Sequence, residues 1–256
     1  IYNVGSQSAV SRPKIKNGTG KNHMTKIQKS EYSFKVIGHI RSDFPEKFGI
    51  PRQSGRVPSL GSTVVFEPEY RNPDAFRELD GFSHIWVLWV FSESVTEKPP
   101  ITVRPPRLGG NRHVGVFASR SPFRPNPIGI SAVRLEKIAY TEKYGPVLHI
   151  SGADMMDGTP IIDIKPYLPS ADLIENAVGG YADGVNDHRL HVKFICEIPD
   201  SLTSDRRRSL SGILADDPRP SYQNAPDRVY MMDFAGHSVG FKVEGDDLYV
   251  VRIEKI

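Results

Sequence analysis

The sequence predicts a mainly β protein with some α structure, in which an antiparallel β-barrel is followed by a small C-terminal domain of one helix and three strands. From Tyr32 onward, about seven short stretches rich in β-branched and aromatic residues alternate with turns that contain Pro and Gly. Only one helical stretch lies among them, which favours an antiparallel sheet closed on itself over a layered α/β fold. Near residue 201 the periodicity becomes helical, and this change marks the C-terminal domain.

The barrel elements follow in order along the chain. Residues 32–42 alternate in polarity and lead into a long loop over 43–62. We expect a strand over 63–68, and then one helix over 73–82 that begins near Asn72 or Asp74. Residues 83–91 predict a buried strand that is apolar on both faces.

Two further strands, residues 113–119 and 129–141, flank a segment rich in Pro and Arg. Residues 144–169 predict two strands joined at Asp157-Gly158, a dipeptide typical of tight turns. These elements define a barrel domain over 31–168.

The C-terminal domain spans 191–256. A strand over 190–199 precedes a helix over 201–215, and three alternating segments follow, with turns at Ala235-Gly236 and Gly245-Asp246.

The net charge of +3 arises in residues 1–23, which carry four Lys and Arg and no acidic residue. Without them, 29 basic residues face 30 acidic ones. Because this stretch is polar and lacks periodicity, we interpret it as a vector-derived, disordered leader before a native start at Met24. A natural basic tail that binds RNA is the alternative. Evidence for nucleic-acid binding must therefore be local.

Several classes of protein are excluded. The longest strongly apolar run, Ile85–Phe91, is about a third of a membrane span, so no membrane partner is expected. The single cysteine, Cys196, excludes an internal disulfide framework and fits a cytoplasmic protein. No G-x-G-x-x-G, P-loop or G-x-S-x-G motif occurs. The eight histidines form no H-x-x-x-H pair and there is no C-x-x-C, so no metal site is expected.

Residues 104–124 hold five arginines and one histidine without an acid. In a chain with balanced charge, such a cluster indicates a surface that faces an anion, because the planar guanidinium suits phosphates and carboxylates. Its prolines and glycines fix the backbone, as is typical where main-chain groups meet a ligand. A solvated face whose arginines pair with acids elsewhere is the alternative.

Six segments together closely resemble the TsaA-like (TrmO) family of S-adenosylmethionine-dependent tRNA methyltransferases. They are residues 37–53, 82–91, 102–110, 115–131, 157–169 and 217–222. The resemblance implies a β-barrel in place of the Rossmann fold, a homodimer with cofactor sites near the subunit interface, and methylation of N6 of N6-threonylcarbamoyladenosine at position 37, beside the tRNA anticodon.

The resemblance also implies the residues that contact S-adenosylmethionine. These residue types fit the cofactor chemically. An arginine can bind its carboxylate, an aspartate its ribose, and an apolar side chain its adenine. The implied contacts are Pro51, Arg52, Gln53, Ser92, Glu93, Arg120, Ile130, Ser151, Gly152, Ala153 and Asp154.

Asp154 is also the candidate catalytic residue, as the group that accepts the N6 proton, although a role at the cofactor ribose competes. Residues expected to contact the anticodon loop, through phosphates, the threonyl carboxylate or base stacking, are Arg107, Arg112, Arg124, Arg219 and Tyr222. Two other hypotheses remain open: a non-catalytic barrel that binds RNA or a nucleotide, and a methyltransferase with a different substrate.

Overall fold

The structure is a computed structural model that describes residues 32–105, 112–183, 188–219, 225 and 227–256. The contacts of Phe34–Ile256 make this stretch one unit. The expected leader over 1–23 lies outside the described residues. Among those that are described, no helix is long and apolar enough to cross a membrane.

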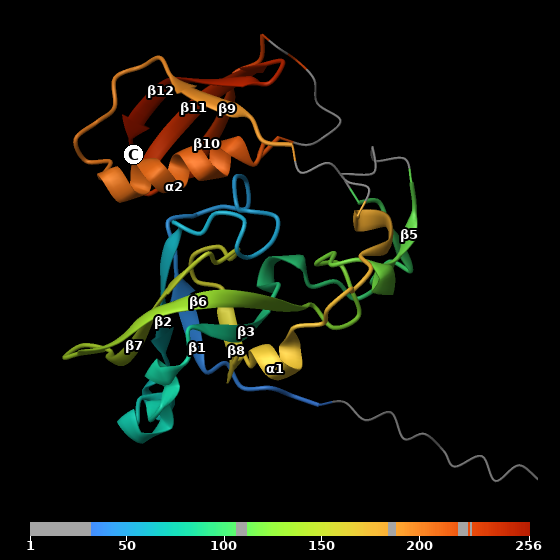
Figure 1. Ribbon diagram of the computed structural model, residues 1–256, viewed down its shortest axis with the longest axis vertical. Helices are drawn as coiled ribbons and strands as arrows, with labels where there is room; N and C mark the ends of the chain where they lie inside the picture. Colours follow the sequence, from blue (N-terminus) through green and yellow to red (C-terminus); the bar gives the residue numbers. More distant parts are fainter. Residues whose placement is uncertain (1–31, 106–111, 184–187, 220–224, 226) are drawn as a thin grey trace, which may run out of the picture. The chain divides into compact units, whose positions relative to one another are not determined.

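Six antiparallel strands form a closed barrel in the order β1-β2-β7-β6-β3-β8 (Figure 1), which confirms the predicted fold class. The barrel closes where β1 pairs with β8. Gly38 lies opposite Ile161, and His39 lies opposite Pro160. The strands are β1 Gly38–Arg41, β2 Gly61–Phe66, β3 His84–Val90, β6 Ile128–Thr141, β7 Gly145–Ser151 and β8 Pro160–Pro166.

The barrel core follows from alternation along its strands, because successive side chains point to opposite faces. In β3, Ile85, Val87 and Trp89 are buried inside, whereas the alternate residues are half-buried or exposed. Residues 83–91 are thus buried on one face rather than on both. The other strands supply the rest of the cluster, including Ile40, Val64, Val133, Leu148, Ile150 and Ile161.

Trp89 lies directly opposite Gly129 of β6, and a Cβ at that glycine would overlap the indole ring. We expect Gly129→Ala to lower the free energy of unfolding by about 1–3 kcal/mol, because the ring must move within a packed core. Urea denaturation measures this. The control is Gly61→Ala in β2, where a Cβ would have no neighbour within 4 Å. Equal effects of the two substitutions would contradict the steric argument.

Two elements of the barrel region differ from those that the sequence predicts. Residues 73–82 form two short 3₁₀ helices, Pro73–Phe76 and Leu79–Gly81, instead of one helix, because Glu78 between them has φ of 67°. Asn72 caps the first, accepting from the amide of Asp74 at 3.0 Å, as expected.

Residues 113–119 form only a two-residue strand followed by a 3₁₀ turn, and β4 pairs with β5 outside the barrel. Val116 is buried in this segment while Phe117 is 80% exposed, so a large apolar side chain stays on the surface. The remaining short elements are β4 Thr102–Val103, β5 Val114–Gly115, η1 Pro68–Tyr70, η4 Ser92–Ser94, η6 Val116–Ala118, α1 Pro169–Asp172 and η7 Gly180–Ala182.

The C-terminal sheet has four strands in the order β10-β11-β12-β9, one more than the three-strand domain that was predicted. The additional strand is the one expected over 190–199, which pairs in parallel with β12. The expected helix begins at Ser204, where the Thr203 side chain accepts from the amide of Arg206 at 3.4 Å. The elements are β9 His191–Phe194, α2 Ser204–Ala215, β10 Tyr230–Phe234, β11 His237–Glu244 and β12 Asp247–Lys255.

The core of this sheet includes residues from the loop between β1 and β2. Phe44, Val57 and Leu60 are buried in one cluster with Leu210 of α2 and Phe234 of β10. The boundaries 31–168 and 191–256 stay a prediction, but part of the first segment packs into the core of the second.

Candidate cofactor pocket

A cavity of about 310 Å³ lies beside the barrel where several loops meet. The β1–β2 loop, the end of β3, the Pro- and Arg-rich segment before β6 and the segment after β7 all contribute to its walls. Of the eleven residues expected to contact a cofactor, eight line it: Pro51, Arg52, Gln53, Ser92, Glu93, Arg120, Ile130 and Asp154.

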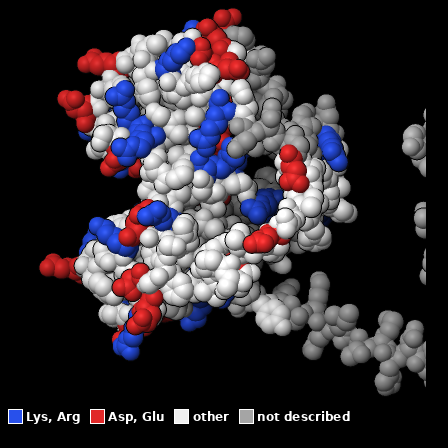
Figure 2. Space-filling model, in the orientation of Figure 1, with Lys and Arg blue, Asp and Glu red and all other residues white. Residues whose placement is uncertain are grey.

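Basic side chains surround this cavity and are held by the polypeptide itself. Arg120 donates to the side-chain oxygen of Gln53. Arg124 donates to the Ser119 carbonyl at 3.1 Å, and Lys47 to the Glu93 carbonyl at 2.9 Å. Figure 2 shows Lys and Arg side chains beside a hollow in this face of the molecule. The pocket therefore suits a ligand that carries a carboxylate or a phosphate.

Asp154 is the inward-facing acid of the pocket. It accepts from the Ser131 hydroxyl at 2.5 Å, and that hydroxyl accepts from the Trp89 indole at 3.0 Å. Burial raises the pKa of Asp154 above the ordinary aspartate value, although the bond from Ser131 and the charge of Arg120 oppose the shift. This carboxylate is therefore more basic than that of an exposed aspartate.

The other three residues expected to contact a cofactor, Ser151, Gly152 and Ala153, do not line the cavity. Gly152 accepts from the Gly55 amide at 2.8 Å and donates to the Leu60 carbonyl at 2.9 Å. Its φ of 77° favours glycine. Ser151 instead donates to Glu136 at 2.5 Å, and Ala153 is buried. In this structure Gly152 fixes the loop that carries Gln53.

The residues expected to contact RNA are dispersed. Arg124 lines the pocket, and Arg112 is exposed on the segment that leads into β5. Arg219 follows α2, where its guanidinium donates to Asp217 at 2.8 and 2.9 Å and its side chain is 11% exposed. Arg107 and Tyr222 lie outside the described residues.

Sequence reasoning did not single out Trp89, Ser131 or Lys47, which also build the site. Trp89 and Ser131 lie on neighbouring strands and are not adjacent in the chain. The apolar sequence of β3 marks Trp89 as a residue of a buried strand, but no local pattern pairs it with Ser131. No group of His, Cys, Asp and Glu in the described part of the chain could hold a metal ion.

A closed barrel with a cationic pocket, a partly buried acid and an apolar wall is typical of a protein that binds a small ligand of mixed charge. Comparison with known families makes this specific. The tRNA-methyltransferase O N-terminal domain matches residues 39–173, and the TrmO C-terminal domain matches 187–256. The chain belongs to the tRNA-methyltransferase O (TrmO) family.

Individual relatives agree. The tRNA (adenine(37)-N6)-methyltransferase of Escherichia coli K12 is 40% identical over 216 residues, covering 80% of this chain and 92% of the relative. A relative from Pseudomonas aeruginosa, named as an S-adenosylmethionine-dependent methyltransferase, is 41% identical over 206 residues, 78% of this chain and 87% of its own. A crystal structure of TrmO from P. aeruginosa superposes with a TM-score of 0.73 at 31% identity, covering 90% of this chain and all of that one.

Proposed function

We propose that this chain transfers a methyl group from S-adenosylmethionine to N6 of the adenine at position 37 of tRNA, with the N6-threonylcarbamoyl form as its substrate. The observation that carries the proposal is the pocket itself. Eight residues from separate segments, each expected to contact the cofactor, line one cavity in a chain of the TrmO family.

The side chains of the pocket fit the cofactor's functional groups. Arg120 supplies a cation for the carboxylate, and Glu93 an acid for the ammonium group. Ile130, which is 51% exposed at the pocket wall, offers an apolar surface to the adenine. The chemistry supplied by the bound cofactor is an electrophilic methyl group on a sulfonium centre. Gly152, between Ser151 and Ala153 of the same expected set, supports this site through its backbone contacts.

The remaining polar residues act on the nucleic acid. Asp154 accepts the proton that leaves N6, because its raised pKa makes it a stronger base than an exposed aspartate. Arg124, at the same pocket, pairs with the threonyl carboxylate. Arg112 contacts phosphates of the anticodon loop, and Arg107, Arg219 and Tyr222 stay in the proposed tRNA-binding set.

Two measurements test the proposal. Calorimetry should show binding of S-adenosylhomocysteine, and mass spectrometry of nucleosides should show one added methyl group on the position-37 adenosine of tRNA after incubation with protein and cofactor. Absence of cofactor binding would leave a non-catalytic RNA- or nucleotide-binding barrel. Cofactor binding without methylation of that adenosine would point to another substrate.

We also propose that the chain forms a homodimer, with contacts close to the pocket. Large apolar side chains are exposed on both sides of Arg120: Phe117 is 80% exposed and Phe123 49%. Ile101, 86% exposed, lies beside them, since its carbonyl accepts from the Val116 amide at 2.9 Å. A patch of this kind is typical of an interaction surface.

A cytoplasmic location, favoured by the single cysteine, stays a prediction.

In light scattering, we expect Phe117→Asp to raise the dissociation constant of the dimer at least about tenfold, because a charge would be buried at the centre of the interface. Tyr140→Asp is the control. It alters a similarly exposed aromatic residue, 63% exposed, near the β6–β7 turn. A dimer that survives Phe117→Asp unchanged, or a parent protein that is monomeric, would refute the proposed interface.

A further inference from the structure

The loop between β1 and β2, residues 43–60, takes part in two sites at once. On one side, Lys47, Pro51 and Gln53 line the cofactor pocket. On the other, Phe44, Val57 and Leu60 are buried in the C-terminal core, with Phe48 and Ile50 packed against it. A movement of this loop would therefore alter both sites.

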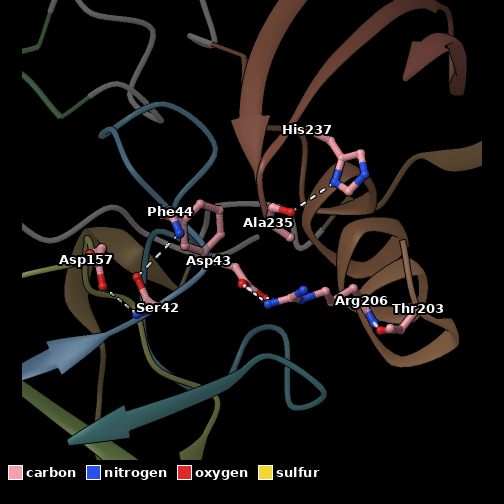
Figure 3. A network of polar contacts seen from close by, with 8 residues as sticks. All are labelled: Ser42, Asp43, Phe44, Asp157, Thr203, Arg206, Ala235 and His237. Atoms are coloured by element: carbon pink, nitrogen blue, oxygen red, sulfur yellow. Dashed lines mark hydrogen bonds and ion pairs between the residues drawn. The ribbon is translucent and has the colours of Figure 1, made fainter. Parts of the chain in front are cut away.

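Polar contacts fix both ends of the loop to the C-terminal domain. Figure 3 shows Arg206 of α2 pointing to Asp43, where it donates at 3.1 and 2.8 Å. The Asp43 carbonyl also accepts from the Ala235 amide at 2.8 Å. At the other end, the Ser209 hydroxyl donates to the Ser59 carbonyl at 2.8 Å. These contacts leave the middle of the loop facing the turn that follows α2.

Arg52 occupies that middle position. Although it lines the pocket, its Nη2 donates to the carbonyls of Asp217 at 2.9 Å and Arg219 at 3.0 Å. Asp217 has a φ of 49°, a left-handed backbone that is uncommon outside glycine, although aspartate adopts it more readily than most residues. One guanidinium thus joins two carbonyls of a tight turn to a wall of the cofactor pocket.

We propose that Arg52 is a positioning residue that holds the Asp217–Arg219 turn beside the cofactor pocket and thereby sets where bound tRNA lies relative to the methyl donor. The inference rests on the proposed function for its substrate. Arg219, one of the residues proposed to bind tRNA, lies in the turn that Arg52 holds. Both bonds to the turn leave the single Nη2 atom of Arg52, so the contact depends on the reach and direction of the arginine side chain.

The test compares Arg52→Ala with Arg120→Ala, because both arginines line the same pocket. For Arg52→Ala we expect the KM for tRNA to rise about tenfold, the loss expected when hydrogen bonds from a charged donor are removed. The dissociation constant for S-adenosylhomocysteine should rise less, by no more than about threefold, because Arg52 lines the pocket but its Nη2 donates to the turn. Arg120→Ala should weaken S-adenosylhomocysteine binding about tenfold and leave the KM for tRNA nearly unchanged.

Amide hydrogen exchange supplies a readout that needs neither ligand. Amides of residues 214–219 should exchange faster in Arg52→Ala and not in Arg120→Ala, since only the former releases the turn. Arg52→Lys should show a smaller increase, since its ammonium keeps hydrogen-bond donors near the end of the side chain, and it replaces the alanine variant if that variant does not fold.

Two results would overturn the inference: unchanged exchange at 214–219, or a tenfold loss of S-adenosylhomocysteine affinity in Arg52→Ala with an unaltered KM for tRNA. Failure of the proposed function gives a different result, because the parent protein would then bind no S-adenosylhomocysteine or would add no methyl group to the position-37 adenosine. In that case the exchange measurement still decides whether Arg52 holds the turn.

Discussion

Asp154→Asn is expected to lower kcat for methyl transfer about 100- to 1,000-fold while the KM for S-adenosylmethionine stays within about threefold. Asparagine retains the shape of the side chain and can still accept from Ser131, which lies 2.5 Å away. It cannot take up the proton that leaves N6. Steady-state kinetics on tRNA measures the effect.

The dependence of kcat on pH gives a second signature. Because only the carboxylate can accept a proton, kcat should fall as pH decreases through the raised pKa of Asp154, at a higher pH than for an ordinary aspartate. The hydrogen bond from Ser131 lowers this pKa, so Ser131→Ala should move the acid limb to still higher pH. A profile that does not move in Ser131→Ala would contradict the assignment.

Loss of structure would not explain the lost activity. Since folding raises the pKa of Asp154, the folded state gains stability when this group is protonated and loses it as pH rises through that pKa. Asp154→Asn removes this loss and should be at least as stable as the parent at pH 7. Asp163→Asn in β8 is the control for kcat, since it lies outside the cofactor pocket and pairs with Lys165 at 2.8 Å. A raised KM with normal kcat in Asp154→Asn would assign Asp154 to the cofactor ribose.

Arg56→Met should destabilise the protein by about 3 kcal/mol, the typical cost of breaking a buried ion pair. Arg56 donates from Nε to Asp216 at 2.6 Å, and the Asp216 side chain is only 5% exposed at the C-terminal end of α2. Without the guanidinium, a buried carboxylate would lie next to the negative end of the helix dipole. Urea unfolding followed by circular dichroism measures the change.

A second substitution isolates the pair. Adding Asp216→Asn to Arg56→Met should recover at least about 1 kcal/mol, because it removes the buried charge. The matched control is Arg208→Met on the same helix, where Arg208 and Asp205 are 70% and 82% exposed and the loss should stay below about 0.5 kcal/mol. Equal losses for Arg56→Met and Arg208→Met would show that burial of the pair does not matter.

The sequence predicts the barrel because short stretches rich in β-branched and aromatic residues recur between turns that contain Pro and Gly. It fails where local geometry overrides composition, as at Glu78, whose positive φ divides a helix-like stretch into two 3₁₀ turns. It also misses β9 as part of the C-terminal sheet. That strand pairs with β12, some 55 residues later, and no local pattern encodes a partner at such a distance.

The resemblance to a family identifies the segments that form the pocket. Only the structure shows in which direction each of their side chains points. Arg52 and Arg120 look alike in sequence, as arginines in stiff loops rich in Pro. In the structure one donates to carbonyls of the C-terminal turn and the other to Gln53. The sequence does indicate that the 43–60 loop packs into a core, because the loop has a higher apolar content than an exposed loop needs. The apolar residues in question are Phe44, Phe48, Ile50, Val57 and Leu60.

The burial of Phe44 against Phe234 also bears on synthesis of the chain. Their rings are 5.4 Å apart in the folded protein but are separated by 190 residues of sequence. At ribosomal rates of about 5–20 residues per second, the loop that carries Phe44 waits roughly 10–40 s for its partner to be made. During this interval its apolar side chains lack the partners that bury them in the folded protein, and such transiently exposed surface is prone to aggregation.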